Sequence, residues 1–135
     1  VLSFHIEENV IFHGWKSDVW TFIQSLTPVS ALILTSKNEG FPMVLLEAMS
    51  RGIYCVASNC ETGPADIVNK NNGQLFEVGN VDELTHKLQY LIDSRGGNLP
   101  SQISIKNSIE KFSSDRYCER IIEALRRGKV RQDDK

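Results

Sequence analysis

Two glutamates stand eight positions apart in the segment SKNEGFPMVLLEAMSRG, which covers residues 36–52. Glu47 lies inside an apolar run, where a carboxylate is rare unless a hydrogen bond or an opposite charge compensates its burial. Glu39 precedes that run, next to a glycine. Carboxylate oxygens are strong acceptors for hydroxyl groups. The pair could therefore bind one hydroxyl-rich ligand from two sides.

The pattern around the glutamates predicts a buried strand over residues 31–34, a loop over 36–41 and a helix over 42–50. Gly40 and Phe41 are the candidate N-cap positions, and neither has a side-chain oxygen. The first N–H groups of the helix are therefore expected to lack a side-chain cap and to attract an anion.

These features together predict a site with three zones. With a rise of about 1.5 Å per helical residue, the two carboxylates should lie on the order of 10 Å apart, on either side of the helix start. A nucleotide-diphosphate sugar matches this layout, with its pyrophosphate on the helix start and its ribose on Glu47. In the alternative interpretation, Glu39 folds back to cap the helix and Glu47 turns to solvent.

Other patterns along the chain predict an α/β fold, a Rossmann-like parallel sheet with helices on both faces. Further strands are expected at residues 10–12, 54–57 and 73–76, and further helices at 19–26, 64–68, 81–92 and 116–126. Ligands of such sheets bind beyond the carboxyl ends of the strands. The loop that carries Glu39 is expected there.

The composition argues for an ordinary globular domain. The chain has 135 residues, a formal net charge of -2 and scattered basic residues, so no nucleic-acid partner is expected. Its three cysteines form no even set and no CxxC pair, which is typical of reduced thiols in the cytoplasm. The first residues show no signal peptide pattern, and no apolar run reaches the ~20 residues of a membrane span.

Several ordered blocks resemble one family. The segments are VIFHGW, ALILTSKN, EGFPMVLLEAMSRG, YCVASNCETGPADIV and NNGQLFEVGNVDEL. Over roughly residues 8–93 they are similar to the C-terminal domain of retaining GT-B glycosyltransferases (glycosyltransferase group 1 family). Within that family, FHGWKSDVW and SKNEGFPMVLLEAMSRGI most resemble bacterial lipopolysaccharide 1,6-galactosyltransferases.

The resemblance implies roles for particular residues. Glu39 would contact the donor hexose as the catalytic residue, and Glu47 would bind the ribose hydroxyls. The remaining nucleotide-sugar-binding positions are Gly40, Phe41, Met43, Val44 and Leu45. Pro42 has no N–H to donate. Trp15 could stack on the donor base, or it could simply pack on the helix that follows it.

The resemblance also implies the reaction. A hexose, with galactose suspected, would pass from a UDP-sugar to a lipopolysaccharide core or another glycan acceptor, with retention at the anomeric carbon. No Asp-x-Asp motif occurs, so no metal and no cofactor are expected. A sugar-nucleotide epimerase, a glycogen-synthase-like enzyme of the same fold and a non-catalytic α/β interaction module remain alternatives.

The expected organisation is a partial C-terminal nucleotide-sugar-binding domain over residues 1–112, a helix over 113–127 and a charged tail over 128–135. In the family an N-terminal Rossmann-like domain holds the acceptor, and it is missing from this sequence. The 135 residues alone are therefore expected to have little or no turnover. The protein is expected in the cytoplasm. The basic run at 126–131 fits either a solvated tail or peripheral association with the inner face of the plasma membrane.

Overall fold

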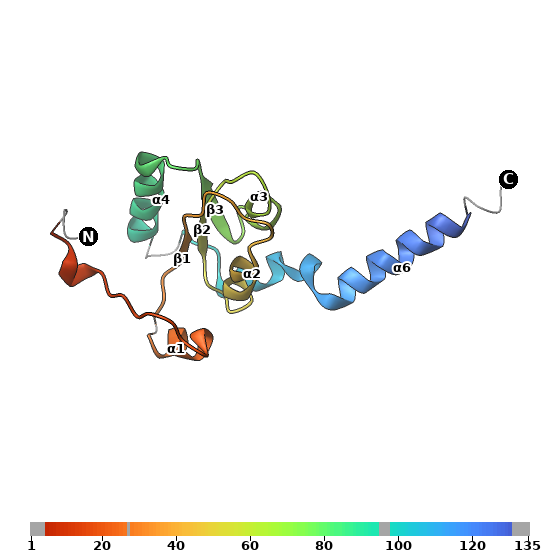
Figure 1. The fold of residues 1–135 in the computed structure, drawn as a ribbon, viewed down its shortest axis with the longest axis horizontal. Helices are drawn as coiled ribbons and strands as arrows, with labels where there is room; N and C mark the ends of the chain where they lie inside the picture. The colour runs from red at the N-terminus through yellow and green to blue at the C-terminus, as the bar shows by residue number, and fades with distance from the viewer. Residues whose placement is uncertain (1–4, 27, 95–97, 131–135) are drawn as a thin grey trace.

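A parallel sheet with strand order β1-β2-β3 organises the computed structural model, which describes residues 5–26, 28–94 and 98–130. In chain order the elements of Figure 1 are η2 (Glu7–Asn9), α1 (Val19–Ser25), β1 (Leu32–Leu34), α2 (Met43–Met49), β2 (Cys55–Ser58), α3 (Pro64–Ile67), β3 (Gly73–Phe76), α4 (Val81–Asp93), α5 (Gln102–Ser108), η3 (Glu110–Phe112) and α6 (Ser114–Val130). The alternation of strands and helices agrees with the sequence prediction.

The central strand shows that both faces of the sheet are covered. Leu32 pairs with Cys55, and Cys55 pairs in turn with Gly73. All four residues of β2 are buried, although their side chains alternate between the two faces. Helices α2 and α3 lie on one side of the sheet and α4 on the other (Figure 1). The predicted α/β fold with a Rossmann-like parallel sheet is confirmed.

Helix α2 is anchored by an apolar face. Leu45, Ala48 and Met49 are completely buried, and their spacing of three and four residues places them on one side of the helix. They pack into one core cluster with β2, and Leu91 of α4 belongs to the same cluster. At about 25 cal/mol per Å² of apolar surface, burial of this kind supplies most of the free energy that holds such a layer together.

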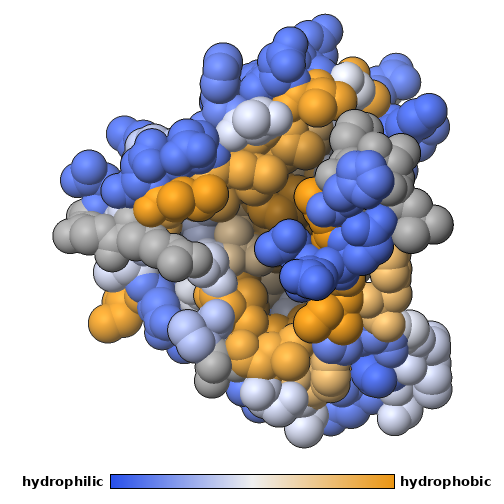
Figure 2. Space-filling model, turned by 90° about the vertical axis from the view of Figure 1, so that its left-hand side faces the viewer, coloured by the Kyte–Doolittle hydropathy of each residue, from blue (hydrophilic) through white to orange (hydrophobic). Residues whose placement is uncertain are grey.

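One predicted strand is wrong. Residues 10–12 have no regular secondary structure and pair with no strand in the described chain, and a strand forms only where a partner completes its hydrogen bonds. Strand β1 likewise has β2 on one edge and no described strand on the other, and Ile33 is 38% exposed. The view in Figure 2 shows apolar surface gathered around a hollow in the molecule.

Two helical segments before α6 were not expected from the sequence. Ser101 is the N-cap of helix α5, and its Oγ accepts a hydrogen bond from the Ser104 amide. It is followed by the short 3-10 helix η3. Asn72, which is fully buried, connects α5 to the sheet because its Nδ2 donates to the Ile67 carbonyl and to Ser108 Oγ. A buried amide with three partners is a strong structural constraint.

The last helix, α6, extends away from the sheet and its covering helices (Figure 1). It includes the predicted helix at 116–126 and runs into the predicted tail, while residues 131–135 of that tail lie outside the described residues. None of the helices in the described ranges is both long enough and apolar enough to cross a membrane.

The thiols agree with the expectation of reduced cysteines. Cys55, Cys60 and Cys118 are all free, and the first two are buried. Burial in the sheet raises the pKa of the Cys55 thiol to about 12, because the charged thiolate would lose its hydration. Cys55 is therefore an inert core residue.

Replacing Asn72 by Ala should lower the free energy of unfolding by about 1–3 kcal/mol, since it removes the acceptor of the Asn69 amide and the donor to the Ile67 carbonyl and Ser108 Oγ. The neighbouring Asn71 is exposed and provides the matched control, because Asn71→Ala removes no side-chain hydrogen bond described in the chain. Urea unfolding of the two variants measures the difference. Equal stabilities would show that the Asn72 bonds contribute nothing.

Candidate functional site

The site predicted from the two glutamates lies where β1 ends and α2 begins. Pro42 is the N-cap of α2, one position later than expected, and no side chain caps the helix. The Met43 amide donates to the Phe41 carbonyl at 2.9 Å, and the Leu45 amide donates to the Pro42 carbonyl at 3.0 Å. Two of the predicted amide donors are thus satisfied by the chain itself.

The amides of Phe41 and Val44 have no acceptor among the residues that the structure describes. Gly40 precedes them, and a Cβ added there would have no atom within 4 Å. This part of the loop therefore leaves its backbone accessible. The alternative in which Glu39 caps α2 is wrong, because no side chain makes that bond.

Hydroxyl groups at the end of β2 and on the loop after it hold the segment that carries Glu39. Ser58, the last residue of β2, donates from its Oγ to the Ser36 carbonyl at 2.5 Å. Thr62 Oγ1 donates to the Glu39 carbonyl. Both hydroxyls come from the chain that leaves β2, so the carboxyl ends of β1 and β2 are tied together. The half-buried side chain of Glu39 projects from a backbone that is fixed at both ends.

Gly63 packs directly against this loop. Its φ is +94°, in the region that favours glycine, and an added Cβ would lie 2.5 Å from Pro42 Cδ and 3.2 Å from the Gly40 carbonyl oxygen. The turn at Gly63 and the start of α3 at Pro64 agree with the sequence prediction. A residue larger than glycine at position 63 would displace the start of α2 at Pro42.

The position of Glu47 follows from the geometry of α2. At about 100° per residue, Glu47 lies roughly 150° around the helix from the buried face formed by Leu45, Ala48 and Met49. The apolar neighbours of Glu47 in sequence thus do not surround it in space. Its side chain is half-buried on the outward face of the helix.

Helix α1 provides the partner of Glu47. Trp20 Nε1 donates to Glu47 Oε2 at 2.8 Å. The Arg51 guanidinium lies 4.3 Å from the centre of the Trp20 ring and also donates to the Glu47 carbonyl at 2.8 Å. Glu47 therefore does not simply turn to solvent, as the alternative interpretation required.

Trp20 lies within the helix predicted at 19–26, but the sequence pattern does not reveal that its indole N–H meets Glu47. Ser58 and Thr62 were missed as well, although both follow a predicted strand at the sheet edge where a ligand was expected. The sequence signal for both hydroxyls was their position just after the strand predicted at 54–57, where ligands of such sheets bind.

The structure places Trp15 differently from the alternative that packs it on the next helix. Trp15 is 85% exposed, whereas the neighbouring His13 packs its ring against Phe22 of α1 at 4.7 Å. The stacking of a base on Trp15 stays a prediction.

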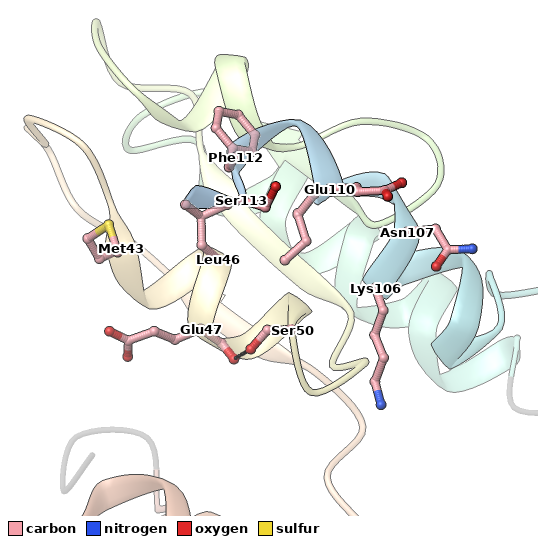
Figure 3. A pocket seen from close by; sticks show the side chains of 10 residues that line it. Met43, Leu46, Glu47, Ser50, Lys106, Asn107, Glu110, Phe112 and Ser113 are labelled. Atoms are coloured by element: carbon pink, nitrogen blue, oxygen red, sulfur yellow. Dashed lines mark hydrogen bonds between the residues drawn. The ribbon is translucent and has the colours of Figure 1, made fainter. Parts of the chain in front are cut away.

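A groove of about 810 Å³ runs beside the outward face of α2 (Figure 3). Met43, Leu46, Glu47 and Ser50 form one side, and α5 and η3 with the residues after them form the other. This volume is in the range of small-molecule sites. Within Figure 3 the Glu47 carboxylate points away from Lys106 and Glu110, which agrees with its hydrogen bond to α1.

Glu47 thus lies at one rim of the groove, near the C-terminal end of α2. The loop that carries Glu39 precedes the N-terminal end of the same helix. The described residues contain no group of three or more His, Cys, Asp or Glu side chains that could hold a metal ion.

Comparison with known proteins shows consistent similarity to one family. The model of the family described as "Glycosyl transferases group 1" matches residues 1–111. The chain is 40% identical over 123 residues to the lipopolysaccharide 1,6-galactosyltransferase of Salmonella typhimurium, covering 89% of this chain and 33% of that protein. It is 37% identical over 131 residues to the Escherichia coli protein of the same name, covering 93% and 36%.

A solved structure agrees with these matches. The apo form of the lipopolysaccharide outer core galactosyltransferase WaaB superposes with a TM-score of 0.84 at 38% identity, covering 92% of this chain and 35% of that one. The chain therefore spans about a third of the length of the relatives it matches.

Gly63→Ala should lower the free energy of unfolding by about 1–3 kcal/mol, because the new methyl group meets Pro42 and the residue must keep a positive φ. Gly40→Ala is the control from the facing loop, where a Cβ meets nothing and the backbone is not left-handed, and it should change stability by less than about 1 kcal/mol. Thermal unfolding compares the two. Equal losses would contradict the close packing of Gly63.

Proposed function

Because this chain belongs to the group 1 glycosyl transferases, we propose that it binds the nucleotide-sugar donor of a retaining, metal-independent hexosyltransferase. The observation that carries the proposal is the pair of half-buried carboxylates, Glu39 in the loop before α2 and Glu47 in the last turn of that short helix. Ligands of parallel α/β sheets bind beyond the carboxyl ends of the strands, where this loop and helix start lie.

Glu39 would bind hydroxyl groups of the donor hexose. Its loop is held by Ser58 and Thr62, so the carboxylate needs little further ordering when the sugar binds. A fixed carboxylate close to the transferring sugar also favours the positive charge that develops on the ring in the transition state. This contact makes Glu39 the catalytic residue of the proposal.

Glu47 would bind the ribose diol of the donor. Its Oε2 accepts the Trp20 N–H, and its Oε1 has no partner in the described parts of the chain. A carboxylate has about four acceptor positions, so one hydrogen bond leaves room for two ribose hydroxyls. The Glu47 carboxylate points away from the far wall of the groove beside α2 and toward α1, so the ribose would bind at the rim and not inside the groove.

Backbone amides at the start of α2 would hold the diphosphate between the two carboxylates. The Phe41 and Val44 amides have no acceptor in the part of the chain that the structure describes, whereas Met43 and Leu45 already donate to the backbone. Neutral N–H groups can stabilise the leaving diphosphate without a metal ion. The donor proposed is UDP-galactose, because the relatives named above are galactosyltransferases.

The acceptor proposed is a lipopolysaccharide core, as the names of the same relatives indicate. Since the chain spans about a third of their length, an N-terminal Rossmann-like domain would bind the acceptor, and turnover would require the full-length protein. Such an enzyme would work in the cytoplasm, where UDP-sugars are made.

In the full-length protein that carries this chain, Glu39→Gln and Glu47→Gln should each lower kcat/KM for UDP-galactose by about 10- to 100-fold, because each loses charge-assisted hydrogen bonds to the donor. Glu8→Gln is the control, since Glu8 is exposed in η2 and far along the chain from both residues. Transfer of radiolabelled galactose to lipopolysaccharide measures all three. Unchanged turnover in both site variants would overturn the proposal.

The product should keep the α configuration of UDP-galactose at its anomeric carbon, and turnover should persist after treatment with EDTA. Proton NMR of the product identifies the configuration through the coupling of the anomeric proton, and the same assay without acceptor detects an epimerase. A β-linked product would contradict retention. Loss of activity that added Mg²⁺ or Mn²⁺ restores would contradict metal independence.

A further inference from the structure

The contact between Trp20 and Glu47 joins two elements that are far apart in the sequence. The residues are separated by 27 positions, and the bond from Nε1 to Oε2 is 2.8 Å long and partly buried. A short, partly buried bond to a charged acceptor is stronger than a bond between neutral groups. The bond therefore restrains the carboxylate of Glu47 and not merely the path of the chain.

Both the helix that carries Trp20 and the indole itself are held in place. Asp18 caps α1, its Oδ1 accepting from the Thr21 amide at 3.0 Å and its Oδ2 from Thr21 Oγ1 at 2.6 Å. Those hydrogen bonds from Thr21 hold the pKa of Asp18 below its usual value, so the cap stays ionised at neutral pH. The indole packs against the hydrophobic core, and the Arg51 guanidinium covers its ring at 4.3 Å.

The chemistry of the indole suits the orientation of a binding carboxylate. An indole N–H donates one hydrogen bond and accepts none, so it fixes one oxygen and leaves the other free to accept. A Lys or Arg partner would neutralise the carboxylate and occupy more of its acceptor positions. The Arg51 guanidinium instead donates to the Glu47 carbonyl and to Ser50 Oγ.

We propose that Trp20 is a positioning residue that fixes one oxygen of Glu47 through its indole N–H, so that the other oxygen binds the ribose diol of the donor. This inference rests on the proposed function. A free glutamate side chain on a helix samples several rotamers, and ordering it on binding would reduce affinity. The bond to Trp20 orders the side chain before the nucleotide binds.

The test compares UDP with its 2′,3′-dideoxy analogue, which lacks the ribose diol. Calorimetry on the full-length protein that carries this chain gives both dissociation constants. The unmodified protein should bind UDP at least about 10-fold more tightly than the analogue. In Trp20→Phe, which keeps an aromatic ring in the core, UDP binding should weaken about 5- to 20-fold while binding of the analogue stays unchanged.

A second variant separates the N–H from the shape of the ring. Benzothienylalanine at position 20 keeps the bicyclic ring and lacks the N–H, so it should lose ribose discrimination as Trp20→Phe does. In a Glu47→Gln background, Trp20→Phe should have no further effect on the ratio of the two dissociation constants, because both changes act on the same interaction.

The possible results distinguish the inference from the proposed function. If the unmodified protein does not prefer UDP, the role of Glu47 in the proposed function is wrong, and the inference fails with it. If the preference exists and persists in both position-20 variants, the role of Trp20 is wrong and the proposed function stands. Equal weakening of both nucleotides would show a purely structural role and would also overturn the inference.

Discussion

The packing of α2 on the central strand is the constraint on which the rest of the site depends. Leu45, Ala48 and Met49 are completely buried, so the helix cannot rotate about its axis without exposing them. That orientation places Glu47 on the outward face, where it meets Trp20. The same packing brings the start of the helix to the end of β1. The apolar face thus positions a polar site that it does not touch.

Polar contacts fix the parts of the site that the apolar face of α2 does not reach. The loop before α2 has no secondary structure of its own, and hydroxyls from Ser58 and Thr62 hold its carbonyl groups. Gly63 allows the next loop to approach Pro42 closely. One carboxylate therefore depends on the loop after β2, and the other depends on α1. Side chains from two separate segments, α1 and the end of β2 with the loop after it, contact α2 and the loop before it. This is typical of sites that need a defined geometry before the ligand arrives.

Membership of the glycosyl transferase family and the open edge of the sheet are consistent with each other. The chain matches about a third of the length of its relatives, and β1 has a free edge in the described chain. In the proposed function, the donor binds to this chain and the acceptor binds elsewhere in the full-length protein.

The sequence by itself determined the order of strands and helices from α1 to α4, the uncapped start of α2 and the positions of Glu39 and Glu47, because these depend on local spacing and residue type. It failed for residues 10–12, since a strand depends on a partner that local spacing does not reveal. It also could not identify the contact between Trp20 and Glu47, which lie 27 positions apart. Only the tertiary structure decided that contact, because the packing of α1 beside α2 determines which polar groups meet.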